Sequence, residues 1–99
     1  MSAADDGILD DEALTQALTD LPGWEQDDDA IVTSYSFDDF GAAIDFMSTA
    51  APRIDELDHH PEWTNVYATV DVRLSSHDVG GVTERDLRLA RVLDAIAGR

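Results

Sequence analysis

Apolar residues recur at intervals of three and four along three stretches of the chain, a spacing typical of amphipathic helices. The stretches cover residues 9–21, 40–57 and 87–96. Pro22-Gly23 favours a turn directly after the first stretch. The residue before Pro61 avoids helical geometry, so the second stretch should end shortly before that proline. We therefore predict three helices.

Helix boundaries can be read from a few polar residues. Asp38 or Asp39 can cap the second helix, and Thr83 with Asp86 resembles a capping box in which Asp replaces the usual Glu. Pro52 interrupts the second helical pattern, because it lacks a backbone N–H and clashes with the preceding turn. We expect it to kink that helix or to divide it into two segments.

The remaining stretches alternate or are rich in β-branched and aromatic residues, which predicts strands. Residues 24–27 and 30–37 flank Asp28-Asp29 and suggest a hairpin. Residues 64–75 alternate with period two and form one long strand or two with a bend. The side of this stretch that we expect to be buried beneath helices includes Val66, Val70, Val72 and Leu74.

The order of these elements predicts an α+β fold, with an antiparallel sheet covered by helices on one face. The 99 residues suit a single domain, 1–99, in which residues 1–8 form a loose N-terminal segment. A core of this size is thin, and the aromatic residues Trp63 and Tyr67 lie near a possible sheet edge. We therefore expect a homodimer or homotetramer.

Charge narrows the possible partners. The chain has 22 acidic residues against six basic ones, all arginine, and a formal net charge of −16. Such a field repels nucleic acid and anionic membranes, so neither is an expected partner. Disorder is one explanation of this charge, but 43% hydrophobic residues with clear periodicity argue against it. We interpret the surface as adapted to high salt, where the screening length falls to about 3 Å.

Other features of the composition exclude several classes. The chain has no cysteine, which rules out disulfides and thiolate metal sites. No apolar run has the length of a membrane span or a signal sequence. We expect a cytoplasmic protein that is not bound to a membrane.

All three histidines lie between positions 59 and 77. His59 and His60 follow the second helix, and His77 follows the long extended stretch. If these ends meet, three imidazoles surround one pocket and can exchange protons near neutral pH. Surface or capping histidines are the alternative. A metal site is less favoured, because adjacent histidines in extended chain point oppositely and zinc would also need Asp or Glu ligands.

Three runs of sequence together resemble the pterin-4a-carbinolamine dehydratase family. They are DHHPEWTNVY at 58–67, VDVRLSSH at 70–77 and GVTERD at 81–86. Gly23-Trp24 and the FDDF run at 37–40 add to the resemblance, which covers nearly the whole chain from about Leu9. Members remove water from a 4a-hydroxytetrahydropterin to give a quinonoid dihydropterin, without metal or organic cofactor.

The resemblance also implies a fold and a set of site residues. Family members have an antiparallel four-stranded sheet with three helices on one face, and usually form dimers or tetramers. His59, His60 and His77 match the active-site histidines. The positions that match residues of the pterin pocket are Asp55, Asp58, Ser75, Ser76, Asp78 and Asp86.

Two other functions remain possible from the sequence. One is a non-catalytic partner protein, because animal members of the family also bind a transcription factor through a helical surface. The other is a pterin-handling protein in molybdopterin metabolism. The complete set of three histidines favours chemistry over a purely structural role, although spacing does not assign acid and base among them.

Overall fold

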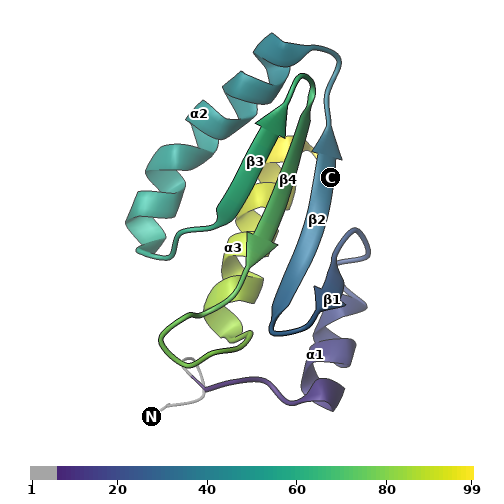
Figure 1. The fold of residues 1–99 in the computed structure, drawn as a ribbon, viewed down its shortest axis with the longest axis vertical. Helices are drawn as coiled ribbons and strands as arrows, with labels where there is room; N and C mark the ends of the chain where they lie inside the picture. The colour runs from purple at the N-terminus through teal and green to yellow at the C-terminus, as the bar shows by residue number, and fades with distance from the viewer. Residues whose placement is uncertain (1–6) are drawn as a thin grey trace.

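The computed structural model describes residues 7–99, so the expected loose segment 1–8 lies largely outside the described residues. Its four strands pair antiparallel in the order β1-β2-β4-β3, which confirms the α+β prediction (Figure 1). None of the helices in the described part is long and apolar enough to cross a membrane. The elements are α1 (Asp11–Leu18), β1 (Glu25–Asp27), β2 (Ala30–Ser36), α2 (Phe40–Leu57), β3 (Glu62–Val66), β4 (Thr69–Leu74) and α3 (Glu84–Ala97).

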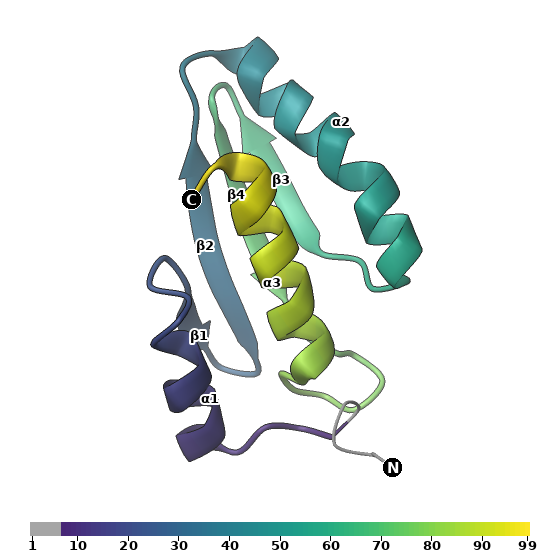
Figure 2. The same cartoon turned by 180° about the vertical axis from the view of Figure 1, so that it is seen from behind.

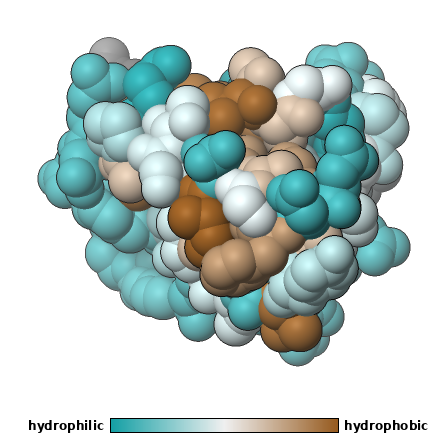
Figure 3. Space-filling view, turned by 90° about the horizontal axis from the view of Figure 1, so that it is seen from above, coloured by the Kyte–Doolittle hydropathy of each residue, from teal (hydrophilic) through white to brown (hydrophobic). Residues whose placement is uncertain are grey.

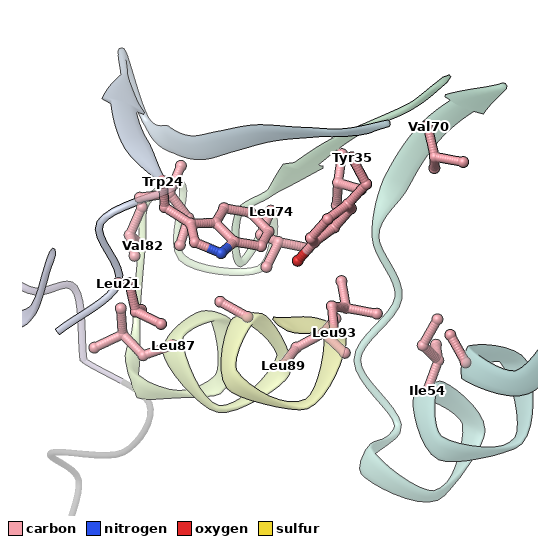
Figure 4. Close-up of a cluster of buried hydrophobic side chains, with 14 of the residues drawn as sticks. Leu21, Trp24, Tyr35, Ile54, Val70, Leu74, Val82, Leu87, Leu89 and Leu93 are labelled. Carbon is pink, nitrogen blue, oxygen red and sulfur yellow. The ribbon is translucent and has the colours of Figure 1, made fainter. Parts of the chain in front are cut away.

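The three helices cover one face of the sheet and leave the other face open. Seen from behind, α3 runs along the middle of the sheet, α2 lies beside it and α1 lies at the β1 end (Figure 2). Apolar side chains of β2 and β4 fill the space between the sheet and α3 (Figure 4). Their buried partners on the helix are Leu87, Leu89, Ala90 and Leu93.

Helix α2 is a single element of 18 residues that continues through Pro52, so division into two segments, one of the two expected effects of this proline, is wrong. The side chain of Asp39 caps it, with Oδ1 accepting the Ala42 N–H at 2.8 Å. Pro52 and Ser48, four residues before it, are both exposed. The Ser48 carbonyl, which lacks a donor from Pro52, can therefore be hydrated.

The extended stretch after Pro61 forms two strands joined by a two-residue turn. Tyr67, in the left-handed region at φ 53°, forms this turn with Ala68, and Val66 pairs with Thr69. Residues that pair across two antiparallel strands project to the same side of the sheet. Because the two-residue turn pairs Val66 with Thr69, odd-numbered residues of β3 share a face with even-numbered residues of β4. Val66 is consequently 72% exposed, and its expected burial is wrong.

The rest of the predicted apolar face is confirmed. Val70, Val72 and Leu74 are each at most 2% exposed beneath the helices. On β3, the inward side chains are Trp63 and Asn65, which are only half-buried at the sheet edge.

A buried carboxylate joins α3 to the far end of the sheet. Asp94 Oδ1 accepts hydrogen bonds from Tyr35 Oη at 2.6 Å and Trp24 Nε1 at 3.0 Å, and it meets Arg99 Nη2 at 3.1 Å. The Arg99 guanidinium also lies 4.4 Å from the centre of the Tyr35 ring. Burial, and then the hydrogen bond to Asp94, raise the pKa of Tyr35 well above its usual value. Trp24 is thereby part of the core.

Candidate active site

The end of α2 determines where the first two histidines lie. Asp58 ends the helix in the left-handed region at φ 51°, a conformation that turns the chain sharply. His59 follows and its side chain is only 10% exposed, whereas that of His60 is 59% exposed. Adjacent residues in extended chain point to opposite sides, so the sequence HHP places one imidazole inside and one outside.

His59 binds a fully buried carboxylate at the start of α3. Its Nε2 lies 2.6 Å from Asp86 Oδ1, and Asp86 is 0% exposed. The other carboxylate oxygen, Oδ2, accepts the Thr83 N–H and the Ser76 hydroxyl, both at 2.9 Å. Ser76 Oγ also lies 2.8 Å from Thr83 Oγ1. The predicted capping box is therefore confirmed, and its carboxylate holds an imidazole as well.

The other two histidines lie at the surface, each beside its own carboxylate. His60 Nε2 lies 3.0 Å from Asp55 Oδ1, and His77 Nε2 lies 3.2 Å from Glu62 Oε1. The side chains of His60 and His77 are 59% and 73% exposed. Exposed pairs of this kind contribute little to stability, about 0–1 kcal/mol.

Asp78, in the loop between β4 and α3, forms an ion pair with Arg85. Arg85 Nη2 donates to both of its carboxylate oxygens, at 2.8 and 3.1 Å. The hydrogen bond from Arg85 lowers the pKa of Asp78, and the nearby charge of His59 acts in the same direction. Asp78 is therefore an anion close to His59.

The structure brings some of the expected site residues together and leaves others apart. His59, Asp86 and Ser76 form one connected group, while His60 with Asp55 and His77 with its own carboxylate form two more. Within residues 7–99, no hydrogen bond joins one imidazole to another or engages the side chains of Ser75 and Asp58. No three His, Asp or Glu side chains of this described range are grouped to hold a metal ion.

Three contacts of the site were not predicted from the sequence. They join Glu62 to His77, Arg85 to Asp78, and Ser76 to Thr83, which the sequence identified only as a cap. Glu62, Arg85 and Thr83 lie within the runs quoted above. Their partners, however, depend on how the loop after β4 folds back, which no spacing reveals.

A hollow of about 1080 Å³ lies on the open face of the sheet, away from the buried pair. It shares Pro61 and Glu62 with the histidine region, and Glu62 contacts His77. Its lining is mixed and includes the polar strand residues Ser34, Asp71 and Arg73 as well as Val32 and Trp63. His77 therefore lies at the rim of this hollow, whereas His59 faces the helix layer.

These contacts give the site the means to transfer protons. A buried carboxylate that holds an imidazole fixes the orientation of the ring, which general acid or base catalysis needs. Two further imidazoles on the same end of the molecule, each beside a carboxylate, can donate or accept a second proton.

Comparison with known proteins identifies the family. Residues 8–96 match the family described as pterin 4 alpha carbinolamine dehydratase. Relatives from Nitrobacter winogradskyi and Bradyrhizobium sp. strain BTAi1, which carry the provisional name pterin-4-alpha-carbinolamine dehydratase, are 53% and 54% identical. These alignments cover 88% of this chain and 88% of the Nitrobacter protein, and 90% and 92% for the Bradyrhizobium protein.

Solved structures agree. The crystal structure of a transcriptional coactivator/pterin dehydratase from Brucella melitensis superposes with a TM-score of 0.90 at 46% identity, covering 93% of this chain and all of that one. A pterin dehydratase-like RuBisCO assembly factor of the alpha-carboxysome shares only the fold, with a TM-score of 0.63 at 20% identity over 76% of this chain and 87% of its own. The chain belongs to the pterin-4a-carbinolamine dehydratase family.

Proposed function

We propose that this protein removes water from a 4a-hydroxytetrahydropterin and releases a quinonoid dihydropterin, by histidine acid–base catalysis. The observation that carries the proposal is the buried pair of His59 and Asp86, in a family member that has all three histidines of the motif. The carboxylate of Asp86 has no exposed surface, and the side chain of His59 remains 10% exposed. Burying a carboxylate costs free energy unless its oxygens accept hydrogen bonds. A buried aspartate that orients a histidine is also the arrangement of Ser-His-Asp catalytic triads.

The reaction needs two proton transfers and no change of oxidation state. An imidazolium gives a proton to the 4a-hydroxyl, the C4a–O bond breaks and water leaves. A neutral imidazole takes a proton from a ring nitrogen, whose electron pair becomes the new C=N bond. Imidazoles in opposite protonation states do both near neutral pH. Polar groups around the site, such as Ser75, can hydrogen-bond the donors and acceptors at the edge of a pterin.

Turnover of a freshly generated 4a-hydroxytetrahydropterin tests this proposal. The dehydration is followed by stopped-flow absorbance in molar potassium chloride, against the spontaneous rate without protein. We expect a rate proportional to protein concentration, which His59→Gln abolishes without loss of the circular dichroism spectrum. A rate equal to the spontaneous one at every protein concentration would refute the activity.

A role as a partner protein is the second candidate, because one end of the molecule exposes apolar side chains. Figure 3 shows apolar surface gathered on the end that is uppermost in Figure 1. The β3–β4 turn and the start of α2 meet here, since Phe37 N–H donates to Ala68 O at 2.9 Å. The exposed apolar patch comprises Phe40, Ile44, Val66 and Tyr67.

This candidate and the enzyme are distinguishable. The name of the Brucella relative combines coactivator and dehydratase, so one fold can be described by both roles. Substitutions in the exposed apolar patch would remove partner binding and leave dehydration intact, while histidine substitutions would do the opposite. A pterin-handling role in molybdopterin metabolism would instead retain pterin binding in a protein that shows no turnover.

A further inference from the structure

Both oxygens of Asp86 are engaged, and they face different parts of the fold. Oδ2 accepts from the Ser76 hydroxyl and the Thr83 N–H, while Oδ1 faces His59. Ser76, Thr83 and Asp86 are all 0% exposed. The carboxylate is therefore anchored on one side by the loop after β4 and by the first turn of α3, which leaves it one orientation from which to hold the imidazole.

This geometry determines which nitrogen of His59 carries the hydrogen. Oδ2 of Asp86 already accepts two hydrogen bonds, so we infer that Oδ1 accepts as well and that the hydrogen of the 2.6 Å contact belongs to Nε2 of the ring. Neutral His59 then has its lone pair on Nδ1. Within residues 7–99 no hydrogen bond engages Nδ1, and this atom is not among the buried polar atoms without a partner, so it reaches the surface.

We propose that Ser76 is a positioning residue that, together with Thr83, fixes His59 as the Nε2–H tautomer and leaves Nδ1 as the nitrogen that exchanges a proton with the substrate. The assignment of Nδ1 to the substrate rests on the proposed dehydration. The full burial of Ser76 favours this supporting role over the direct contact with a pterin that the resemblance implied. Ser76 acts through Asp86 and does not touch the reacting atoms.

The tautomer can be measured without any substrate. In protein labelled with ¹⁵N-histidine, the shifts of the two ring nitrogens above the titration range identify the protonated one. For the wild-type chain we expect His59 to carry its hydrogen on Nε2. Hydrogen on Nδ1 would overturn the proposal whatever the activity, and this measurement needs no variant to fold.

Ser76→Ala then tests the anchor. Losing one hydrogen bond to a charged group should lower kcat about tenfold and leave KM within about twofold, with His59 present as a mixture of tautomers. Ser76→Thr retains the hydroxyl and should restore most of kcat, and Ser76→Cys, a weak donor of similar size, should lie between. Thr19→Ala removes another hydroxyl bond, the 2.7 Å contact with the Gln16 carbonyl at the end of α1, and should change neither quantity.

The possible outcomes separate the two proposals. An unchanged tautomer and kcat in folded Ser76→Ala would overturn the positioning role. A kcat that falls equally in the Thr variant would also overturn it, because a packing defect would then be the cause. A wild-type protein without turnover, but with Nε2–H in the wild type and mixed tautomers in Ser76→Ala, would overturn the dehydration and support the positioning of the ring.

Discussion

The three imidazoles differ sharply in how far the protein encloses them. His59 is almost covered and bonded to a carboxylate that is itself anchored, whereas His60 and His77 are more than half exposed beside single carboxylates. An enclosed imidazole keeps one orientation, while exposed ones can reorient toward a ligand. On the proposed mechanism, the enclosed ring has a defined geometry before the substrate arrives, and the exposed rings acquire theirs on binding.

At the residue scale, His60→Ala and His77→Ala test whether the exposed histidines take part. Each should lower kcat by about 10²–10⁴-fold, the typical loss for a general acid or base. Stability should change little, because the pairs with Asp55 and Glu62 are exposed. The double variant should lose less than the product of the two single losses, because groups that act as a unit are not additive.

The measurement is stopped-flow dehydration in molar salt, with circular dichroism on each variant as the control for folding. A folded His77→Ala protein with the wild-type rate would exclude His77 from the mechanism and shift support to the partner-protein role.

Tyr35 gives a second prediction at this scale, for alkaline pH. Its pKa is raised in the folded state, chiefly by burial and by the hydrogen bond to Asp94. The unfolded chain therefore loses the phenol proton first, near pH 10. The stability that this proton contributes is complete below pH 10 and falls as pH rises further, by about 1.4 kcal/mol per pH unit.

Urea unfolding of the wild type and of Tyr35→Phe between pH 8 and 11 measures this effect. Tyr35→Phe should be less stable than the wild type at pH 8, because it loses the 2.6 Å bond to Asp94, but the difference should shrink above pH 10. A difference that stays constant across this range would contradict the assignment.

The sequence predicted which residue types form the site better than how they connect. The histidines, Asp86 and the capping box could be identified from motifs and spacing. The pairing of His77 with Glu62, or of Asp78 with Arg85, could not. Such pairs depend on side-chain directions in a loop, where no periodic pattern constrains the backbone.

At the scale of elements, the same reasoning succeeded where a pattern repeats and failed at its interruptions. The three helices and the α+β class follow from periodicity. Val66 was misplaced because even-numbered residues face the core in β4, whereas odd-numbered residues do so in β3, across the two-residue turn. Apolar residues occur at both odd and even positions near this turn, so the sequence does not show the change. The division expected at Pro52 did not occur because the exposed side of a helix tolerates proline, and a pattern alone does not give the burial of one turn.

The hairpin predicts that the same substitution, valine to threonine, changes the free energy of unfolding by different amounts at two sites. Val72→Thr, at 2% exposure, should lower the free energy of unfolding by about 1–3 kcal/mol, since it buries a hydroxyl. Val66→Thr, at 72% exposure, should change it by no more than about 0.5 kcal/mol. The two substitutions keep the same shape and β-branching, so each is the control for the other in urea unfolding. Equal losses would contradict the register of β3 against β4.

At the scale of the whole molecule, the net charge of −16 on 99 residues should make stability depend on salt. At low ionic strength unscreened repulsion destabilises the compact state. We therefore expect the melting temperature to fall on dialysis to low salt and to recover in molar potassium chloride. Sucrose, which stabilises folded proteins without screening charge, should not reproduce the full recovery. A melting temperature that is independent of salt would disprove adaptation to salt.

Self-association is the second prediction for the whole molecule. The exposed apolar patch of Phe40, Ile44, Val66 and Tyr67 is unusual on so charged a surface, and we expect it to be covered in a dimer or tetramer. Light scattering in molar salt should give two or four times the monomer mass of 10.8 kDa. Val66→Glu should shift this mass toward the monomer, whereas Thr15→Glu, the same charge added on α1, should not. A wild-type mass of 10.8 kDa at micromolar concentration would refute this.

Asp86 both caps the start of α3 and holds His59, so the geometry proposed for catalysis lasts only while the first turn of α3 stays folded. Helix termini open and close locally far more often than a protein unfolds as a whole. Here, each opening of the first turn of α3 withdraws the Thr83 N–H from Asp86 and so loosens the partner of His59. On the proposed mechanism, hydrogen–deuterium exchange at the Thr83 amide therefore reports the fraction of molecules that are momentarily unable to react, in a protein that is otherwise fully folded.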